Sequence, residues 1–474
     1  MRLDAKTLPE IGIPAPEYDR AGIGVGIVHF GVGGFHRAHQ AVYLDRLMNA
    51  GEAREWGICG VGVLPGDRRM ADALTVQDGL YTLLVEHPDG TRSARVIGSL
   101  VDYRYAPDDP ESVVELLAAP STRIVSLTIT EGGYDIDAAA DAEVSVFGLL
   151  TAGLARRRER GVPAPTIVSC DNIEGNGVVA RRALTGYAER IDPGLAAWIA
   201  AEVRFPSSMV DRITPATTES VIDAVATEFG VEDRWPVVAE PYSAWVLEDD
   251  FADGRPPLAD AGVLLVDDVT PYELMKLRLL NAGHQSLCYF AYLAGYRLVH
   301  EAAADPLFAE FVGAYMEYEA TPTLLPVPGI DLADYRRTIL RRFANPGIAD
   351  TVERLCAWSS DRIPQWLLPV VRANLASRGS VRLAAATVAS WARYAEGVDE
   401  HGEPIHVVDQ LADRLVPLAR SQRDDPIAFL TDTAVFGDLA EQPRFVDAYV
   451  RALDSLHRHG ARETLAHLIS EVTV

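Results

Sequence analysis

Residues Val25–Arg37 read VGIVHFGVGGFHR, and this stretch decides the fold. An apolar run with strand character enters a glycine-rich turn, and the turn leads into a segment with helical character. Gly31 and Gly33 occupy the first two positions of the pattern G-x-G-x-x-G. In that pattern the first glycine makes the turn and the second lets a pyrophosphate approach the backbone. The stretch therefore predicts a strand–turn–helix unit whose backbone amides face a dinucleotide.

The turn departs from the full pattern at its third position, where His36 replaces a glycine. We expect Gly34 and Phe35 to line the cofactor site with their backbone, and Arg37 to contact a phosphate directly. The pattern G-x-G-G is weak by itself, so a glycine turn in an ordinary β–α unit is the alternative.

The acidic residue that binds the adenosine ribose should follow the second strand, which we predict at Gly57–Val63. The residues after this strand run LPGDRR, so Asp67 is the candidate. Arg68 and Arg69 follow it directly and suit a 2′-phosphate. NAD is therefore the favoured cofactor, and NADP stays open.

Strand-like and helical stretches alternate up to residue 270, as is typical of a parallel sheet with crossover helices. From Pro271 onward strand signals nearly vanish. We predict an α/β protein with a Rossmann-type NAD-binding domain over residues 1–270 and a mostly α-helical substrate-binding and catalytic domain over residues 271–474. The predicted strands are Val25–Phe30, Gly57–Val63, Arg123–Ile129, Thr166–Cys170 and Val263–Val266, with an antiparallel hairpin of Tyr81–Glu86 and Ala94–Leu100. The predicted helices are Arg37–Ala50, Glu111–Ala119, Val144–Arg160, Val178–Glu189, Leu274–Leu293, Pro306–Glu319, Asp331–Arg342, Ile348–Trp358, Ile363–Ser377, Arg382–Ala395, Ile427–Phe436 and, in two pieces, Pro443–Leu468.

Composition excludes several other classes of protein. The 474 residues are 48% hydrophobic and 23% charged, as in a soluble globular chain of more than one domain. A net charge of −25 opposes binding to nucleic acid or to anionic membranes. The four cysteines and eleven histidines lack the spacing of zinc ligands, and no apolar run reaches the length of a membrane span. We expect buried reduced cysteines, no metal and a cytoplasmic protein, either a monomer or a small homo-oligomer.

Lysine is almost absent from this chain: of 43 basic residues only Lys6 and Lys276 are lysines. Arginine replaces lysine wherever a surface cation suffices, but a guanidinium keeps its proton at any working pH, whereas a buried ammonium can lose it. A lysine within PYELMKLRLLNAGHQSLCYF therefore suggests proton transfer, with chance survival as the alternative.

Lys276 shares one side of its predicted helix with other polar residues. At about 100° per residue, Glu273 lies about 60° from Lys276 and His284 about 80°. Asn281 lies about 140° away on the same side. Leucines between them make the helix buried, and buried polar groups are costly unless paired, so the cluster predicts a lined cavity. There a lysine would act as general base, Asn281 would donate to an alkoxide and His284 would hold a substrate oxygen.

Two further segments carry polar residues. Residues 169–177, SCDNIEGNG, follow a predicted strand and offer the amide of Asn172 at the carboxyl end of the sheet, where α/β folds bind ligands. Residues 210–215, VDRITP, place Asp211 and Arg212 between apolar residues. These two residues either belong to the site, or they pair with each other or cap a turn.

With these segments the chain resembles the mannitol dehydrogenases, a polyol-specific family of long-chain dehydrogenases/reductases. The resemblance spans nearly the whole chain, from GIVHFGVGGFHRAHQAVYLD through WGICGVGVLPGDRR and SLTITEGGYDID to LPVPGIDL. Its most specific motifs are V-x-F-x-x-S-x-V-D-R-I-x-P at Val203–Pro215 and K-x-x-x-x-N-x-x-H at Lys276–His284. It implies zinc-independent oxidation of a polyol to a ketose with NAD, first D-mannitol to D-fructose. D-arabinitol, sorbitol and, by reduction, fructuronate are the alternative substrates, and a non-catalytic nucleotide-binding protein is the alternative of another class.

The resemblance also assigns roles to the residues of the site. Lys276 would take the hydroxyl proton while hydride passes to NAD. Asn172 and Asn281 would stabilise the alkoxide in place of zinc. His284 would orient the substrate, which would also contact Asn172 and Lys276.

Further assignments follow from the same resemblance. Asp211 matches a position near substrate and nicotinamide, and Glu273 matches a carboxylate that gates proton release. Glu131 in TITEGGY would assist Glu273 in proton release and lie beside the cofactor. Arg372 would bind the substrate. Some NAD-preferring relatives carry an acidic pair after the second strand; its first member here is Gly66, so strict NAD preference stays open.

Overall fold

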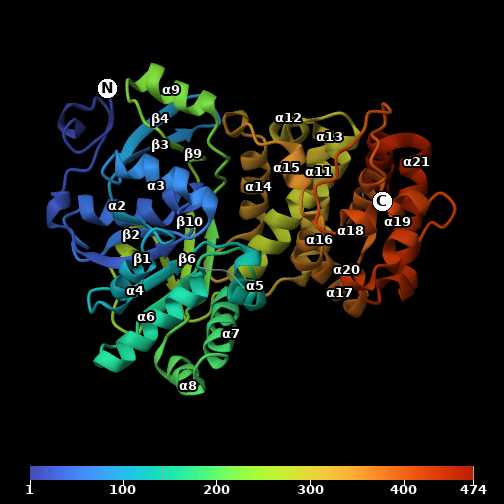
Figure 1. The fold of residues 1–474 in the computed structure, drawn as a ribbon. Helices are drawn as coiled ribbons and strands as arrows, with labels where there is room; N and C mark the ends of the chain where they lie inside the picture. The colour runs from blue at the N-terminus through green and yellow to red at the C-terminus, as the bar shows by residue number, and fades with distance from the viewer. Residues whose placement is uncertain (142–143, 473–474) are drawn as a thin grey trace. The chain divides into compact units, whose positions relative to one another are not determined.

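The computed structural model describes residues 1–141 and 144–472 (Figure 1). The chain divides into two compact units, Met1–Thr270 and Pro271–Val474. The first unit holds the sheets, and the second is built from helices.

A five-stranded parallel sheet forms the centre of the first unit, in the order β5-β2-β1-β6-β7. The central strand β1 (Val25–Phe30) therefore has β2 on one side and β6 on the other. The crevice at the carboxyl ends beside such a strand is where open α/β sheets bind ligands. The remaining strands are β2 Gly57–Gly62, β5 Leu100–Tyr105, β6 Ile124–Leu127 and β7 Thr166–Ser169.

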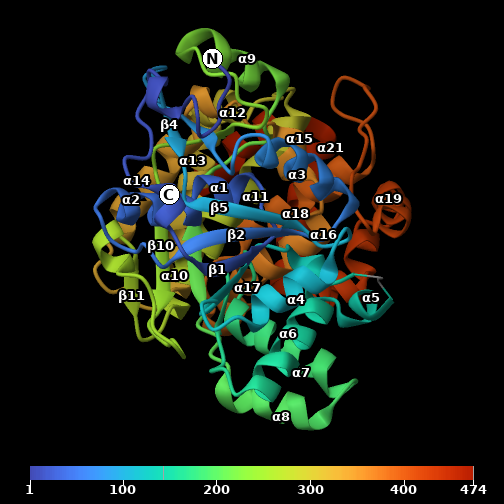
Figure 2. The same ribbon diagram turned by 60° about the vertical axis from the view of Figure 1, so that its left-hand side comes forward.

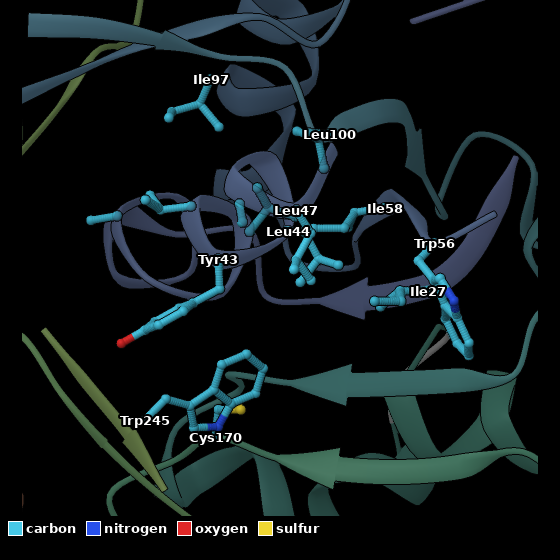
Figure 3. Packing of buried hydrophobic residues seen from close by; sticks show 14 of the residues in the cluster. Ile27, Tyr43, Leu44, Leu47, Trp56, Ile58, Ile97, Leu100, Cys170 and Trp245 are labelled. Carbon is cyan, nitrogen blue, oxygen red and sulfur yellow. The ribbon is translucent and has the colours of Figure 1, made fainter. Parts of the chain in front are cut away.

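Helices cover both faces of this sheet. Successive side chains of a strand point to opposite faces, so Ile27 packs in one apolar cluster and Val28 in the other. Figure 3 shows Leu44 and Leu47 of α2 (Gln40–Asn49) beside Ile58 in the cluster of Ile27. The other face is covered by α4 Pro110–Ala118, α6 Val146–Arg160 and α7 Asn176–Glu189, which lie below β1 and β2 in Figures 1 and 2.

Capping residues set the ends of α6. The Ser145 hydroxyl accepts a hydrogen bond from the amide of Gly148 at its start, and Gly161 takes the left-handed conformation (φ 65°) at its end. Local sequence signals of this kind explain why the predicted and observed bounds of α6 differ by only a few residues.

Two smaller sheets complete the first unit, in the orders β4-β3-β9 and β11-β10-β8. The predicted hairpin is confirmed as the antiparallel pair β3 and β4. Several short strands and helices were not predicted, because a few residues show too little periodicity. The strands of the smaller sheets are β3 Tyr81–Glu86, β4 Arg92–Ile97, β8 Ser208–Asp211, β9 Val237–Ala239, β10 Ala244–Glu248 and β11 Leu264–Val266. Of the strands, β5, β8, β9 and β10 were missed. The missed helices are α3 Arg68–Thr75, α5 Ile136–Asp141, α8 Pro193–Glu202, α9 Glu219–Phe229, α12 Val299–Ala304, α16 Ser359–Arg362 and α19 Ala412–Ser421.

The second unit is helical, as predicted; within residues 271–472 the backbone forms isolated bridges but no strand. Its core is α18 (Arg382–Ala395), which is buried from Leu383 onward and packs against α11 and α21. The split of the last helix is confirmed, because α21 is interrupted at Gly460 (φ 79°). The other helices are α10 Thr270–Met275, α11 Ala282–Leu293, α13 Pro306–Ala314, α14 Leu332–Phe343, α15 Val352–Cys356, α16 Ser359–Arg362, α17 Leu368–Ser377, α20 Thr433–Phe436 and α21 Pro443–Val472.

Three predicted helices of this unit contain a π-helical turn, in which hydrogen bonds join residues five apart: one lies within the helix, one at its end and one at its start. These turns are η6 Lys276–Asn281, η7 Tyr315–Ala320 and η10 Ile363–Leu367. Two other predictions were too long: helix occupies only Val352–Cys356 of Ile348–Trp358 apart from a short 3₁₀ turn, and Ile427–Phe436 divides into a 3₁₀ turn and α20. Pro417 inside α19 explains why that helix was missed.

Candidate active site

In the glycine turn after β1, Gly31 and Gly33 have different surroundings and different structural roles. Gly31 has φ 88°, and a Cβ added there would lie 2.0 Å from the carbonyl oxygen of Thr128, so only glycine fits. At Gly33 an added Cβ would meet nothing nearer than the Gly31 carbonyl oxygen at 3.8 Å. Gly33 is exposed and precedes α1 (Gly34–Ala38). The turn therefore leaves an open backbone surface at the start of a helix, which suits an approaching phosphate.

Arg37 and Phe35 face different surroundings within this turn. The Phe35 ring stacks on His39 with 4.9 Å between centroids. Arg37 is fully buried; its Nε donates to the Gly33 carbonyl (3.3 Å) and its Nη1 to the Trp235 carbonyl. These bonds anchor α1 from inside the fold. They give the side chain a structural role, and the phosphate contact of Arg37 stays a prediction.

Asp67 lies just after β2, where the ribose-binding acid was predicted. Its Oδ2 accepts hydrogen bonds from the amides of Val63 and Leu64, both at 2.9 Å. The two arginines that suit a 2′-phosphate are both engaged: Arg68 donates to Asp108 (2.6 Å) and lies over the Tyr105 ring. Arg69 pairs with Glu219 at 3.7 Å and covers the Trp235 ring.

Asn172 and Glu131 lie where the neighbouring strands β7 and β6 end, and both side chains are exposed. Asn176, in contrast, is buried and structural. Its amide donates to the carbonyls of Asp171 (3.0 Å) and Ser208 (2.7 Å), and its oxygen accepts from the Ser208 amide. These bonds tie the loop after β7 to β8.

Asp211 ends β8 and is 3% exposed. The neighbouring Arg212 donates to the carbonyls of Glu240 (3.0 Å) and Ala38 (2.6 Å), and burial lowers the pKa of its guanidinium to about 10. Arg212 is thus a link between distant backbone segments, so its charge does not require Asp211 as a partner.

Lys276 begins the π-helical turn η6, and Asn281 ends it. The regular α-helical angles predicted for this segment are therefore wrong in detail, because a π-turn is wider than an α-turn. Its burial is as predicted: Glu273, Lys276, Asn281 and His284 are all between 5% and 9% exposed. Such turns occur frequently at functional sites. Among the described residues the Asn281 side-chain oxygen is buried without a hydrogen-bond partner, as suits a group kept for a ligand.

His284 stacks on Phe343 with 3.9 Å between ring centroids. Burial holds the pKa of its imidazole well below the ordinary value, and the positive charges of Arg354, Arg342, Arg362 and Lys276 lower it further. His284 is therefore neutral at physiological pH. Lys276 lies close enough for its charge to lower the pKa of His284.

Three arginines near His284 were missed by the sequence reasoning: Arg342, Arg354 and Arg362. Arginine is the common cation of this chain, so its presence carries no signal of the kind that singled out the lysine. Arg354 pairs with Asp350 (Nε–Oδ1 2.6 Å), and Arg362 donates to the carbonyl of Arg354 (3.1 Å).

Arg372, predicted to bind substrate, is occupied elsewhere. Its half-exposed guanidinium pairs with Asp438 (2.5 Å) and donates to the carbonyl of Phe436 (2.9 Å). The substrate-binding prediction for Arg372 therefore lacks support, and the arginines around His284 are better placed within this unit.

The cysteines and possible metal ligands complete the description. All four cysteines are buried and form no disulfide, as predicted. Over residues 1–141 and 144–472 no three histidine, cysteine or acidic side chains come together as a metal site would require. In the same ranges, no helix has both the length and the apolar character to cross a membrane.

The glycine turn after the central strand of a parallel sheet is typical of a Rossmann-type dinucleotide-binding domain. Two family models match the chain: the mannitol dehydrogenase Rossmann domain over residues 25–260, and the mannitol dehydrogenase C-terminal domain over residues 268–457. The chain belongs to the mannitol dehydrogenase family.

Individual relatives agree with this family. A mannitol 2-dehydrogenase of Phaeosphaeria nodorum is 43% identical over 488 residues, covering 98% of this chain and 85% of the relative. The structure of Pseudomonas fluorescens mannitol 2-dehydrogenase in a ternary complex with NAD and D-mannitol matches with a TM-score of 0.92 and 42% identity, covering 99% of this chain and 100% of that chain. A substrate-free D-sorbitol dehydrogenase matches with a TM-score of 0.87 and 35% identity, covering 98% and 100%.

Proposed function

We propose that this protein oxidises a secondary alcohol of a polyol to a ketose with NAD, and that D-mannitol, giving D-fructose, is its substrate. The observation that carries the proposal is the buried set of Lys276, Asn281 and His284 around a π-turn, in a chain whose Pseudomonas fluorescens relative binds NAD and D-mannitol. The 1–270 unit would hold the cofactor, and the 271–474 unit would supply the base.

The residues of the glycine turn fit a dinucleotide. Gly33 leaves the backbone open for the pyrophosphate at the start of α1, and Asp67 follows β2 for the ribose. The engagement of Arg68 and Arg69 with carboxylates favours a cofactor without a 2′-phosphate. When bound, NAD supplies the acceptor for the hydride that leaves the alcohol carbon.

Lys276 acts as the general base that takes the proton of the reacting hydroxyl. Lys276 is 5% exposed, and burial disfavours the charged form of an amine. Asn281 and Asn172 donate to the alkoxide, a role that needs preorganised donors rather than a mobile charge. His284 stays neutral and orients the substrate, held against Phe343. Glu273, Glu131 and Asp211 are assigned proton release and cofactor contact.

The experiment is a substrate panel. D-mannitol, sorbitol and D-arabinitol are each assayed for oxidation with NAD or NADP, and D-fructose and fructuronate are each assayed for reduction with NADH or NADPH. We expect D-mannitol with NAD to give the highest kcat/KM. Lys276→Arg should lower turnover at neutral pH by about 10²–10⁴-fold, because arginine keeps its proton. Lys6→Arg, the same change at the chain's other, exposed lysine, is the matched control. No turnover of any substrate, or near-normal activity of Lys276→Arg, would overturn the proposal.

Reduction of a uronate is the second candidate, because Arg342, Arg354 and Arg362 near His284 suit a carboxylate. The pairing of Arg354 with Asp350 weakens that candidate. Preference for fructuronate over D-fructose in the panel would establish it.

A further inference from the structure

Asp171 joins the ends of two neighbouring strands through one buried carboxylate. It follows β7 and is 8% exposed. Its Oδ1 accepts a hydrogen bond from the Thr130 amide (2.9 Å), and its Oδ2 accepts from the Ile129 amide (3.2 Å) and the Tyr134 hydroxyl (2.7 Å). All three donors belong to the segment that follows β6, so this single side chain fastens that segment to the end of β7.

The fastened segment contains a strained residue. Thr130 has φ 62° and ψ 172°, a region that is essentially reserved for glycine and is costlier still for a β-branched side chain. Such a conformation persists only where its surroundings impose it, and it occurs preferentially at functional sites. The bond from the Thr130 amide to Asp171 is one such restraint. Glu131 follows Thr130 directly, and Asn172 follows Asp171.

We propose that Asp171 is a positioning residue, whose ionised carboxylate holds the turn at Ile129–Glu131 against the end of β7 and thereby fixes Glu131 and Asn172 for the reaction. This inference rests on the proposed function, in which Asn172 donates to the alkoxide. Asp171 itself touches neither substrate nor cofactor in this scheme. It acts through the geometry of the two residues beside it.

The ionised form is the one that accepts three hydrogen bonds at once. Burial raises the pKa of Asp171 to about 6, against the lowering effect of the bonds from Tyr134, Thr130 and Ile129, and the negative charge of Glu131 adds to the rise. The other polar groups that face it in this unit are the Ser169 hydroxyl, which contacts Tyr134, and the Cys170 thiol. Below about pH 6 the carboxyl of Asp171 gains a proton, and this proton faces groups that are themselves hydrogen-bond donors. The hydrogen bonds that hold the segment after β6 to the end of β7 therefore weaken.

The raised pKa also gives the sign of the stability effect. Protonation of Asp171 favours the folded state, so this contribution is present below pH 3.8 and is lost as the pH rises through about 6. The protein therefore carries ionised Asp171 at some cost to stability at neutral pH. A buried group with that property is a candidate for a functional role.

The test is Asp171→Asn, which keeps the shape but places an NH₂ group against a donor. We expect kcat to fall about 100-fold, as for a small misplacement of reacting groups, with little change in the KM for NAD. Hydrogen exchange of the Ile129 and Thr130 amides should become faster. Tyr134→Phe removes one of the three bonds and should give a smaller loss. Asp137→Asn, the same change at an exposed carboxylate of α5 that pairs with Arg190, should leave activity unchanged.

The pH dependence of ketose reduction distinguishes the titration of Asp171 from that of Lys276. In that direction Lys276 acts as an acid and keeps its proton at low pH, so its titration cannot remove activity there. We expect wild-type reduction to fall below about pH 6, and this acid limb to be absent in Asp171→Asn.

Asp171→Asn with kcat within about twofold of wild type and unchanged amide exchange would overturn the inference. If wild-type protein turns over no polyol, the proposed function fails, yet the exchange experiment still tests the tie on its own. If Asp171→Asn does not fold, Tyr134→Phe decides: slower turnover and faster exchange support the inference, and wild-type values of both refute it.

Discussion

Gly33→Ala should weaken cofactor binding while sparing the fold. The new Cβ would lie 3.8 Å from its nearest neighbour, the Gly31 carbonyl oxygen, and Gly33 has φ −97°, which alanine adopts without strain. The expected loss of folding stability is about 1 kcal/mol or less, the difference between glycine and alanine at a helix start. The methyl group nevertheless occupies the open backbone surface that a pyrophosphate approaches.

Gly31→Ala, two residues earlier, is the comparison. Its Cβ would stand 2.0 Å from the Thr128 carbonyl oxygen, and its φ of 88° adds a left-handed penalty of about 1–2 kcal/mol. We therefore expect opposite effects from the same substitution: Gly31→Ala lowers the thermal midpoint strongly, and Gly33→Ala leaves it nearly unchanged.

The assay is thermal unfolding without and with NAD, combined with a fluorescence titration of NADH. Gly33→Ala should weaken NADH binding at least tenfold, about 1.4 kcal/mol, and lose the stabilisation by NAD. Wild-type affinity for NADH in Gly33→Ala would refute the reasoning, because the pyrophosphate would then lie elsewhere.

Other predictions concern the second unit and the chemistry. Glu319→Ala should cost about 3 kcal/mol in a denaturant titration, because the buried Glu319 accepts the amides of Leu383 (2.9 Å) and Ala384 (2.8 Å) at the start of α18; a loss under about 1 kcal/mol would contradict this. Arg372→Ala should leave the KM for D-mannitol within about twofold, and a large rise would restore its substrate-binding role. Unfolded His284 binds a proton below about pH 6.5, whereas burial lowers its pKa in the folded state, so His284 contributes a fall in the free energy of unfolding as the pH drops. His29 and His36 contribute in the same direction and Asp171 in the opposite one, so His284→Asn should reduce this fall without removing it. Activity should survive dialysis against a chelator, and its loss with recovery on adding zinc would disprove metal independence.

Local features of the fold were the predictable ones. The glycine turn, the capped helix α6 and the hairpin of β3 and β4 follow from neighbouring residues, which set backbone conformation and periodicity. Short strands such as β9, three residues long, offer too few positions for such a pattern. The π-turn at Lys276 also escaped, because nothing in the residue types distinguishes it from an α-turn.

The candidate site was predictable in its rare residues and not in its common ones. Lys276 stood out because lysine is scarce, and Asn281 and His284 shared its helix. The hydrogen bond of Arg37 to the Trp235 carbonyl was not predicted, because Trp235 lies far along the chain. Asp171 was missed for a similar reason, because its backbone donors lie 41 and 42 residues earlier, in the turn after another strand.

The sequence by itself determined the division into an α/β and a helical unit, the glycine turn after β1 and the family of the protein, since each depends on contiguous residues. Only the tertiary structure decided which polar side chains hold distant segments of the fold together. The physical reason is that a buried charge or amide must find a partner, and the partner is supplied by chain segments that the local sequence does not reveal.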